Sequence, residues 1–216
     1  MRITDLHNHT KFSYDGTNTC EEIIENGIKK GISVIGISDH QFSINNLDEY
    51  IEKVKECKEK YKDKITVKCG LEIGLRPKPS DLVSFNRKGL DYCLFESLDS
   101  NRDYTMDLYE FLEWTRLFKM PKGLAHTDIF RLSEKYRTDI LKLMKEYDLF
   151  WEINTSGNYT YYYDFITNFS KQQIIKKSGI AVSLGSDTHY VNDLKTEKLR
   201  SAHNLVSSLG NPIIFL

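Results

Sequence analysis

The sequence lacks the features that would place it in a disulfide-rich, membrane or nucleic-acid-binding class of protein. It has only four cysteines in 216 residues, scattered without a C-x-x-C pair, which is typical of a reduced, cytoplasmic protein and excludes a disulfide framework or a zinc knuckle. No apolar run approaches the roughly 18 residues that a membrane span needs, and residues 1–5 lead into polar sequence rather than into a signal peptide. The net charge of -1 gives no reason to expect a nucleic acid as partner. We therefore expect a folded cytoplasmic protein without a membrane partner.

Strand-like runs alternate with helical patterns from one end of the chain to the other. Several of the runs are apolar on both faces, as strands covered on both sides tend to be. Seven or eight such alternations predict an α/β protein with a parallel sheet, and favour a closed or nearly closed barrel over an open sheet. No linker or composition shift divides the chain, so we expect a single domain over residues 1–216. The expected strands are residues 1–6, 32–38, 65–71, 90–95, 123–125, 149–153 and 180–184, with a weaker candidate at 212–215.

Helices are expected between these strands. Thr19 and Glu22 form a capping box at the start of the first helix, and Gly31 provides its stop. Ser170 can cap a later helix that ends before Gly179. Apolar residues also recur at helical spacing within residues 50–61, 108–115 and 140–147.

Most of the histidines follow expected strands. The carboxyl ends of parallel strands share one face of the molecule, which is where sites form in this architecture. A single histidine after a strand is more often packed or capped than functional, but five at equivalent positions favour a common site. These five are His7, His9, His40, His126 and His189, whereas His203 stands alone in an expected helix and is taken as structural or exposed.

The spacing of these residues favours metal binding. His7 and His9 lie at i and i+2, so their imidazoles point to the same side of an extended chain and can bind one ion at roughly 2.0–2.1 Å. Asp187 and His189 have the same i, i+2 spacing, with a carboxylate in place of one imidazole. A mixed set of imidazoles and carboxylates suits Zn, Mn or Fe(II). The set exceeds the needs of one ion, so we expect two or three, with a carboxylate such as Glu72 bridging a pair roughly 3.5–4 Å apart.

The order of the motifs resembles that of a known family. The chain carries DLHNHT at residues 5–10, FSYDG at 12–16, SDH at 38–40, GLE at 70–72, AH at 125–126 and GSDTH at 185–189. This set is similar to the motifs of the PHP (polymerase and histidinol phosphatase) superfamily. The resemblance implies a distorted seven-stranded (β/α) barrel with a trinuclear metal centre at the carboxyl ends of the strands. It also implies metal-dependent hydrolysis of phosphate monoesters.

The resemblance further implies a set of metal ligands. Asp39 is either a ligand or a hydrogen-bond partner of a liganding imidazole. The family commonly has a further histidine after the fourth strand, where this chain has Glu96 and Asp99 instead. Either of these carboxylates substitutes for it, or the second ion is weakly held. The implied ligands are His7, His9, Glu72 and Asp187 for the first ion, Glu72 and His126 for the second, and Asp15, His40 and His189 for the third.

Residues 151–157 and 180–185 resemble the histidinol-phosphatase branch of the superfamily. That branch tends to continue the first of these segments with an arginine, where this chain has Asn158 and Tyr159. A small phosphorylated substrate is expected, with histidinol phosphate among the candidates. The tyrosines of residues 159–163 either form a rim over the site or pack between helices.

The expected reaction is in-line attack on phosphorus by a hydroxide that the metals generate. We expect Glu72, Asp187 and His189 to act in catalysis, and Arg76, Arg131 and Asn154 to bind the substrate. Arginine is the side chain whose fork matches two phosphate oxygens.

Two alternative functions stay open at this point. One is a metal-dependent amidohydrolase, which shares the His-x-His motif but typically has a modified lysine between its metals, and no lysine ends the fourth strand here. The other is a non-catalytic PHP-like domain. The oligomeric state is also open.

Overall fold

The computed structural model describes residues 2–76, 85–100 and 105–215, and within them it has an α/β fold. Eight strands form two sheets, and every pairing within them is parallel. The prediction of a parallel α/β protein is therefore confirmed. The first sheet contains β1 (Thr4–Asp5), β2 (Val34–Ile37) and β3 (Thr66–Cys69). The second contains β4 (Glu72–Gly74), β5 (Cys93–Glu96), β6 (Lys122–Leu124), β7 (Leu149–Asn154) and β8 (Val182–Gly185).

The count of seven strands that the resemblance implied is not confirmed, because the described residues contain eight strands. The difference arises at Gly70, where the chain leaves its pairing with β2 and then begins to pair with β5. The Tyr92 ring packs so close to Gly70 that an added Cβ would lie 2.2 Å from it. Residues on either side of this point therefore belong to two strands, β3 and β4. The weaker candidate at 212–215 forms only an isolated bridge, between Ile213 and Val182, and Met1 lies outside the described residues.

The two sheets adjoin one another at both edges. Next to β8, the Leu6 amide donates a hydrogen bond of 2.8 Å to the Leu184 carbonyl. Parallel bridges also join Asn8 to Thr188 and His40 to Glu72, just beyond the strands. The segments that carry the predicted site residues are thus held together by the backbone itself.

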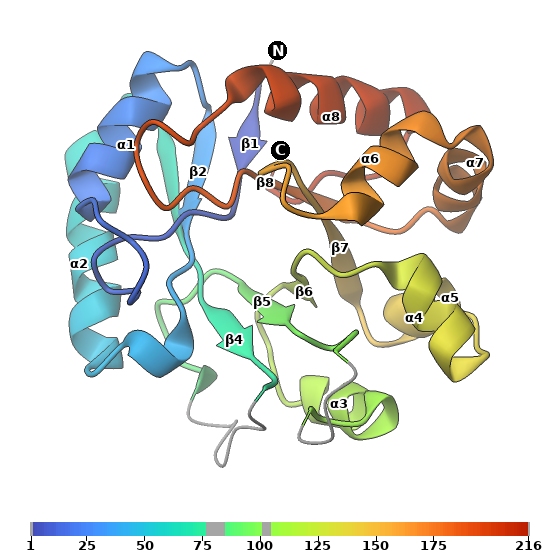
Figure 1. The fold of residues 1–216 in the computed structure, drawn as a ribbon. Coiled ribbons are helices and arrows are strands. Elements are labelled where there is room, and N and C mark those ends of the chain that lie inside the picture. The colour runs from blue at the N-terminus through green and yellow to red at the C-terminus, as the bar shows by residue number, and fades with distance from the viewer. Residues whose placement is uncertain (1, 77–84, 101–104, 216) are drawn as a thin grey trace.

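The helices lie around the outside of the strands (Figure 1). The Thr19 capping box is present, but Asn168 caps α7 rather than Ser170, since the Asn168 side chain accepts from the Lys171 amide. The sequence patterns did not predict α4 or α6. The helices are α1 (Cys20–Lys29), α2 (Leu47–Tyr61), α3 (Leu108–Thr115), α4 (Ile129–Tyr136), α5 (Ile140–Glu146), α6 (Thr160–Thr167), α7 (Phe169–Ser178) and α8 (Thr196–Leu209), with a short 3-10 helix η1 (Gln41–Ser43).

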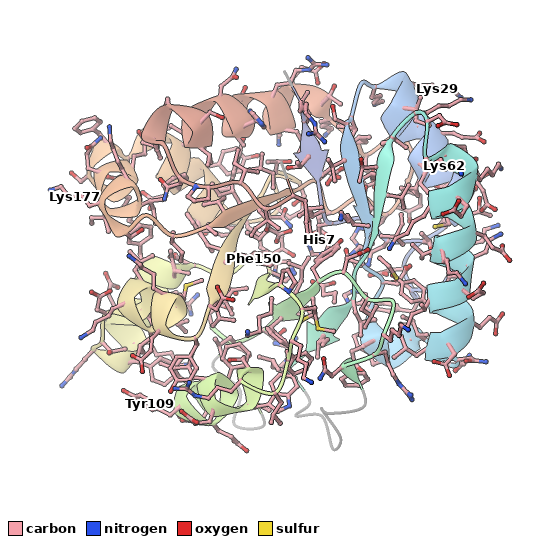
Figure 2. The ribbon with its side chains drawn as sticks, turned by 180° about the vertical axis from the view of Figure 1, so that it is seen from behind. His7, Lys29, Lys62, Tyr109, Phe150 and Lys177 are labelled. Atoms are coloured by element: carbon pink, nitrogen blue, oxygen red, sulfur yellow. The ribbon has the colours of Figure 1, made fainter. Side chains whose placement is uncertain are left out.

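Two apolar clusters hold the fold together. The larger fills the space between the strands and the surrounding helices. The smaller lies on the inner face of the strands and includes Leu6, Tyr92 and Phe150. In Figure 2, Phe150 and His7 lie near the middle of the molecule, whereas Lys29, Lys62 and Lys177 lie on helices at its edge. No helix among the described residues is long and apolar enough to span a bilayer.

Candidate metal centre

The end of β1 is tied to the end of β8 by a buried carboxylate. Asp5 accepts hydrogen bonds from the amide of Ser186 at 2.8 Å and from its hydroxyl at 2.7 Å. Burial raises the pKa of Asp5 to about 6, and the bonds from Ser186 oppose that rise. The Asp187 amide then donates to the His7 carbonyl at 2.9 Å. These bonds bring together the two motifs that lie farthest apart in the sequence.

Asp39 organises the loop that follows β1. Its carboxylate accepts from the amides of Thr10 and Ser13, at 2.6 and 3.1 Å, and from the Thr10 hydroxyl at 2.8 Å. It makes no hydrogen bond to an imidazole of the described residues, so that role proposed for it is wrong. Ser13 in turn places its hydroxyl 3.1 Å from His9 Nδ1.

Three ligand atoms converge beside β1 and β8. His7 Nε2 and His9 Nε2 lie 3.0 Å apart, and Asp187 Oδ1 lies 3.6 Å from the first and 3.3 Å from the second. Ligand atoms around one ion at about 2.1 Å lie about 3.0–3.4 Å from one another in octahedral or tetrahedral arrangements. The triangle therefore has the size of one face of a metal coordination shell.

Glu72 lies at the centre of the cluster, and its two oxygens face different imidazoles. Oε1 lies 2.9 Å from His126 Nε2 and 3.3 Å from His7 Nε2. Oε2 lies 3.0 Å from His40 Nδ1 and 3.5 Å from His9 Nε2. A carboxylate that faces two groups of nitrogens in this way has the arrangement of a ligand that bridges two ions.

A third group lies nearer the surface. Asp15 Oδ2 is 3.4 Å from His40 Nε2 and 3.2 Å from His189 Nε2, and His9 completes the set. The structure thus brings together all eight residues that the sequence predicted as principal metal ligands.

Several buried polar atoms of the cluster make no hydrogen bond among the described residues, as is typical of side chains that can hold cations. They are Asp15 Oδ1 and the pair Glu72 Oε2 and His40 Nδ1, which lie 3.0 Å apart without hydrogen-bond geometry. None of the ion pairs of the cluster carboxylates involves a lysine or arginine of the described residues. Buried charges are usually paired or bind metals, so these side chains fit divalent ions well.

The pKa values describe the same imbalance of charge. Burial alone would lower the pKa of His7, but Glu152, Glu72 and Asp187 outweigh it and raise the pKa well above its usual value. Burial likewise lowers the pKa of His126, yet the hydrogen bond and charge of Glu72 raise it to about 9. Burial would raise the pKa of Glu72, but the surrounding imidazoles hold it well below its usual range. The carboxylates of the cluster therefore favour positive charge beside them.

The sequence interpretation did not identify Glu152 as a site residue. Its side chain is buried on β7, where Oε1 accepts from His7 Nδ1 at 2.6 Å and Oε2 accepts from the His126 amide at 2.7 Å. The bond leaves the other ring nitrogen of His7 free to face the cluster, which is the usual role of a carboxylate behind a metal-binding histidine. A charged residue within an otherwise buried strand was the signal that could have revealed it.

The predicted substrate-binding residues lie at different places. Asn154 is buried, and its amide lies 3.3 Å from Asp187 Oδ2. Arg76 follows β4 and donates to the Ser100 hydroxyl at 3.2 Å. Arg131 is exposed on α4 and makes no hydrogen bond to the cluster within the described residues.

Of the two carboxylates proposed to replace the missing histidine, only Glu96 joins the cluster. Its Oε1 lies 3.6 Å from His40 Nδ1, in a group with Glu72, whereas Asp99 belongs to none of the candidate groups in the described chain. Burial raises the pKa of Glu96, and the charge of Glu72 raises it further. A cation shared with Glu72 would relieve that repulsion.

Aromatic rings surround the cluster. Tyr159 stacks on His126 with ring centroids 4.5 Å apart, and its hydroxyl lies 3.4 Å from Asp187 Oδ2. Tyr14 and Phe42 stack on His40, with centroids 5.5 and 5.0 Å from it, although they are 73% and 57% exposed. The tyrosines of residues 159–163 therefore serve both expected roles, since Tyr159 borders the site and the next residues of α6 are partly packed in the core.

Comparison with known proteins agrees with the motifs and the geometry. The model of the PHP domain family matches residues 5–156. A histidinol-phosphatase of Lactococcus lactis is 24% identical, and the match covers 88% of this chain and 85% of that protein. Its crystal structure with zinc, L-histidinol and phosphate superimposes with a TM-score of 0.69 at 19% identity, covering 98% of this chain and 95% of the other. A putative histidinol phosphatase from Listeria monocytogenes gives a TM-score of 0.62 at 17% identity, covering 88% and 97%. With the family match spanning most of its length and the motif residues gathered in one cluster, this chain belongs to the PHP domain family.

Proposed function

We propose that this protein is a metal-dependent phosphoesterase that hydrolyses a small phosphate monoester. The observation that carries the proposal is the buried cluster of imidazoles and carboxylates with no lysine or arginine paired to it within the described residues. Several of its ligand atoms lack any hydrogen bond, as expected of side chains that hold cations.

The donor set fits two or three divalent ions, of zinc, manganese or iron. The residues that would hold them are His7, His9 and Asp187, then Glu72 and His126, and finally Asp15, His40 and His189, with Glu96 as an additional ligand. Ions held there supply an activated water and neutralise charge on the phosphate oxygens. The zinc in the structure of the Lactococcus lactis relative supports this proposal.

The side chains of this protein would position the reacting groups. Glu72 and Asp187 are held by their imidazole neighbours in the ionised form, because these neighbours lower both pKa values against the effect of burial. Asn154 orients Asp187 through its amide. His189, the most exposed of the five clustered imidazoles at 25%, is the best placed to reach a leaving group.

We also propose that an arginine binds the phosphate group of the substrate. Arg76 is the better candidate because it follows β4, the strand that carries Glu72, whereas Arg131 is exposed on its helix. The exposed rings of Tyr14 and Phe42 would contact the leaving group, since both stack on His40 at the mouth of the cluster.

Histidinol phosphate is the first substrate to test. The similarity to the Lactococcus lactis histidinol-phosphatase supports it. Asn158 and Tyr159 stand where that branch tends to have an arginine, so we propose that substrate preference differs in detail.

The architecture that we infer is one domain in which the two sheets act together as a distorted barrel. The bridges between β1 and β8, and between the ends of β2 and β4, support this inference. Four free, buried cysteines support a reducing, cytoplasmic location. The oligomeric state stays open.

Hydrolysis assays with defined metals test the function. The purified protein, loaded with Zn²⁺ or Mn²⁺, should release phosphate from p-nitrophenyl phosphate and from histidinol phosphate, and chelation should abolish the release. Cleavage of a small amide alone would favour an amidohydrolase, and no turnover of any phosphate ester would favour a non-catalytic domain.

A further inference from the structure

A cavity lies at the opposite end of the strands from the metal cluster. It has a volume of about 490 Å³, within the usual range for small-molecule sites. Lys122, which begins β6, and Leu149, which begins β7, both line it. His126 follows β6 at its other end, about 13 Å farther along the chain at the usual rise of a strand. The cavity therefore cannot be part of the metal site.

One lysine places its charged group in this cavity. Lys122 is only 7% exposed as a whole residue, but its ammonium group is not among the buried polar atoms without a partner, so it reaches the solvent of the cavity, and it makes no hydrogen bond or ion pair with the described residues. A lysine commonly buries its aliphatic stem in this way while its charged end stays in water. The position suits an anion that enters from solvent.

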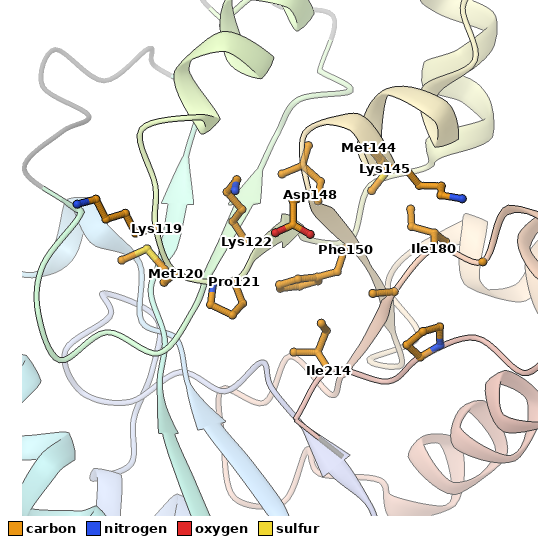
Figure 3. A pocket seen from close by; sticks show the side chains of 14 residues that line it. Lys119, Met120, Pro121, Lys122, Met144, Lys145, Asp148, Phe150, Ile180 and Ile214 are labelled. Carbon is orange, nitrogen blue, oxygen red and sulfur yellow. The ribbon is translucent and has the colours of Figure 1, made fainter.

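The charges around Lys122 limit what that anion can be. In Figure 3, Lys122, Asp148 and Phe150 lie together at the centre of the cavity, whereas Lys119 and Lys145 extend away from it. The ammonium group of Lys145 already donates to the Ser178 carbonyl at 2.9 Å. No ion pair joins Lys122 to Asp148, so one cation and one anion face the same space separately. One cation beside one anion fits a ligand group with a single negative charge better than a phosphate dianion.

The rest of the wall is apolar. Besides Phe150, it includes Met120, Met144, Ile180 and Ile214. An apolar body can therefore pack on the ring and the aliphatic side chains while a charged group reaches Lys122. Sites for small organic molecules commonly combine such walls with one or two polar groups.

We propose that this cavity binds a small carboxylate with an apolar body, the carboxylate on Lys122 and the body against Phe150 and Ile214. The site is separate from the metal cluster and does not depend on the proposed catalytic activity. An ammonium group on the same ligand would find its partner in Asp148.

Calorimetry and thermal unfolding of the purified protein test this proposal with phenylacetate, phenylalanine and inorganic phosphate as probes. We expect phenylacetate or phenylalanine to bind with a Kd near or below about 1 mM and to raise Tm with concentration. Tighter binding of phenylalanine would show that Asp148 pairs with its ammonium group. Phosphate should bind more weakly than either.

Two variants and a control locate the binding. Lys122→Met should weaken binding by about tenfold or more, because a charge-assisted hydrogen bond is lost. Asp148→Asn should strengthen binding of phenylacetate. Lys68→Met is the control, since Lys68 is a partly buried strand lysine that lies over the Phe215 ring outside this cavity.

Three results would overturn the proposal. They are no binding of either organic probe at millimolar concentration, equal binding of inorganic phosphate, or unchanged binding in Lys122→Met. If Lys122→Met fails to fold, the response of Asp148→Asn to phenylacetate decides, because Asp148 is exposed and its substitution leaves the core intact.

Discussion

The clearest test of the metal centre is substitution of Glu152, a residue that the sequence analysis did not identify. Glu152 accepts three hydrogen bonds, from the His7 ring at 2.6 Å, from the His126 amide at 2.7 Å and from the Asn154 side-chain amide at 3.4 Å. In Glu152→Gln only one of the two side-chain atoms can still accept, so at least one donor is left facing an NH₂ group. The substitution also removes the negative charge that helps to raise the pKa of His7.

We expect Glu152→Gln to weaken metal binding by about 10- to 100-fold, which is the usual cost of losing the partner of a metal-binding histidine. This corresponds to about 1.4–2.7 kcal/mol of binding free energy. Affinity is measured by competition with a chromophoric chelator, and metal content by elemental analysis. Hydrolysis of p-nitrophenyl phosphate at saturating metal separates loss of metal from loss of turnover.

Ser183→Ala serves as the matched control. Ser183 is the residue paired with Glu152 across β7 and β8, and its buried hydroxyl has no hydrogen-bond partner. The control should keep metal affinity within about twofold of the unmodified protein, because no donor or acceptor bond is lost. If Glu152→Gln also stays within that range, the positioning role of Glu152 is refuted.

Three further predictions address the cluster and its mouth. His9→Ala should abolish turnover and lower the metal content while leaving the far-ultraviolet circular dichroism spectrum unchanged, since His9 lies beyond the end of β1; full activity would exclude it from the site. The pKa of His126 is raised to about 9 in the metal-free protein, so protons compete with metal for this imidazole up to that pH. Metal affinity, measured by competition with a chelator, should therefore keep rising from pH 6.5 to 9. A plateau above pH 7 would contradict this expectation. Phe42→Ala should lower kcat/KM for phenyl phosphate more than for ethyl phosphate. Phe169→Ala, at a phenylalanine that is also exposed (71% against 57% for Phe42), should change neither. A uniform loss in Phe42→Ala would show that Phe42 does not contact the leaving group.

Much of the cluster could be predicted from the sequence because its ligands occupy equivalent local positions. His7, His40, His126 and His189 each follow a strand, and parallel strands end on one face whatever their order in the sheet. The i, i+2 spacing of His7 and His9 likewise depends only on extended backbone. Neither argument needs tertiary contacts.

Other features depend on contacts between remote segments. β4 (Glu72–Gly74) lies just beyond the strand expected at 65–71, and it is defined by its pairing with β5, a segment about 20 residues farther along the chain. The choice of Asn168 over Ser170 as the cap of α7 is a matter of two residues, which pattern alone does not resolve. Asp39 was expected either as a metal ligand or as a hydrogen-bond partner of an imidazole, but its carboxylate accepts from the loop amides of Thr10 and Ser13.

Local chemistry along the chain is enough to establish an α/β protein of the PHP family with imidazoles and carboxylates at its strand ends, since backbone periodicity and ligand type are read residue by residue. Only the three-dimensional structure shows that Glu72 faces four imidazoles and that Glu152 supports His7. Those features depend on distances of about 3 Å between atoms that lie on different strands. Such distances are set by packing of the whole fold, and no local pattern contains them.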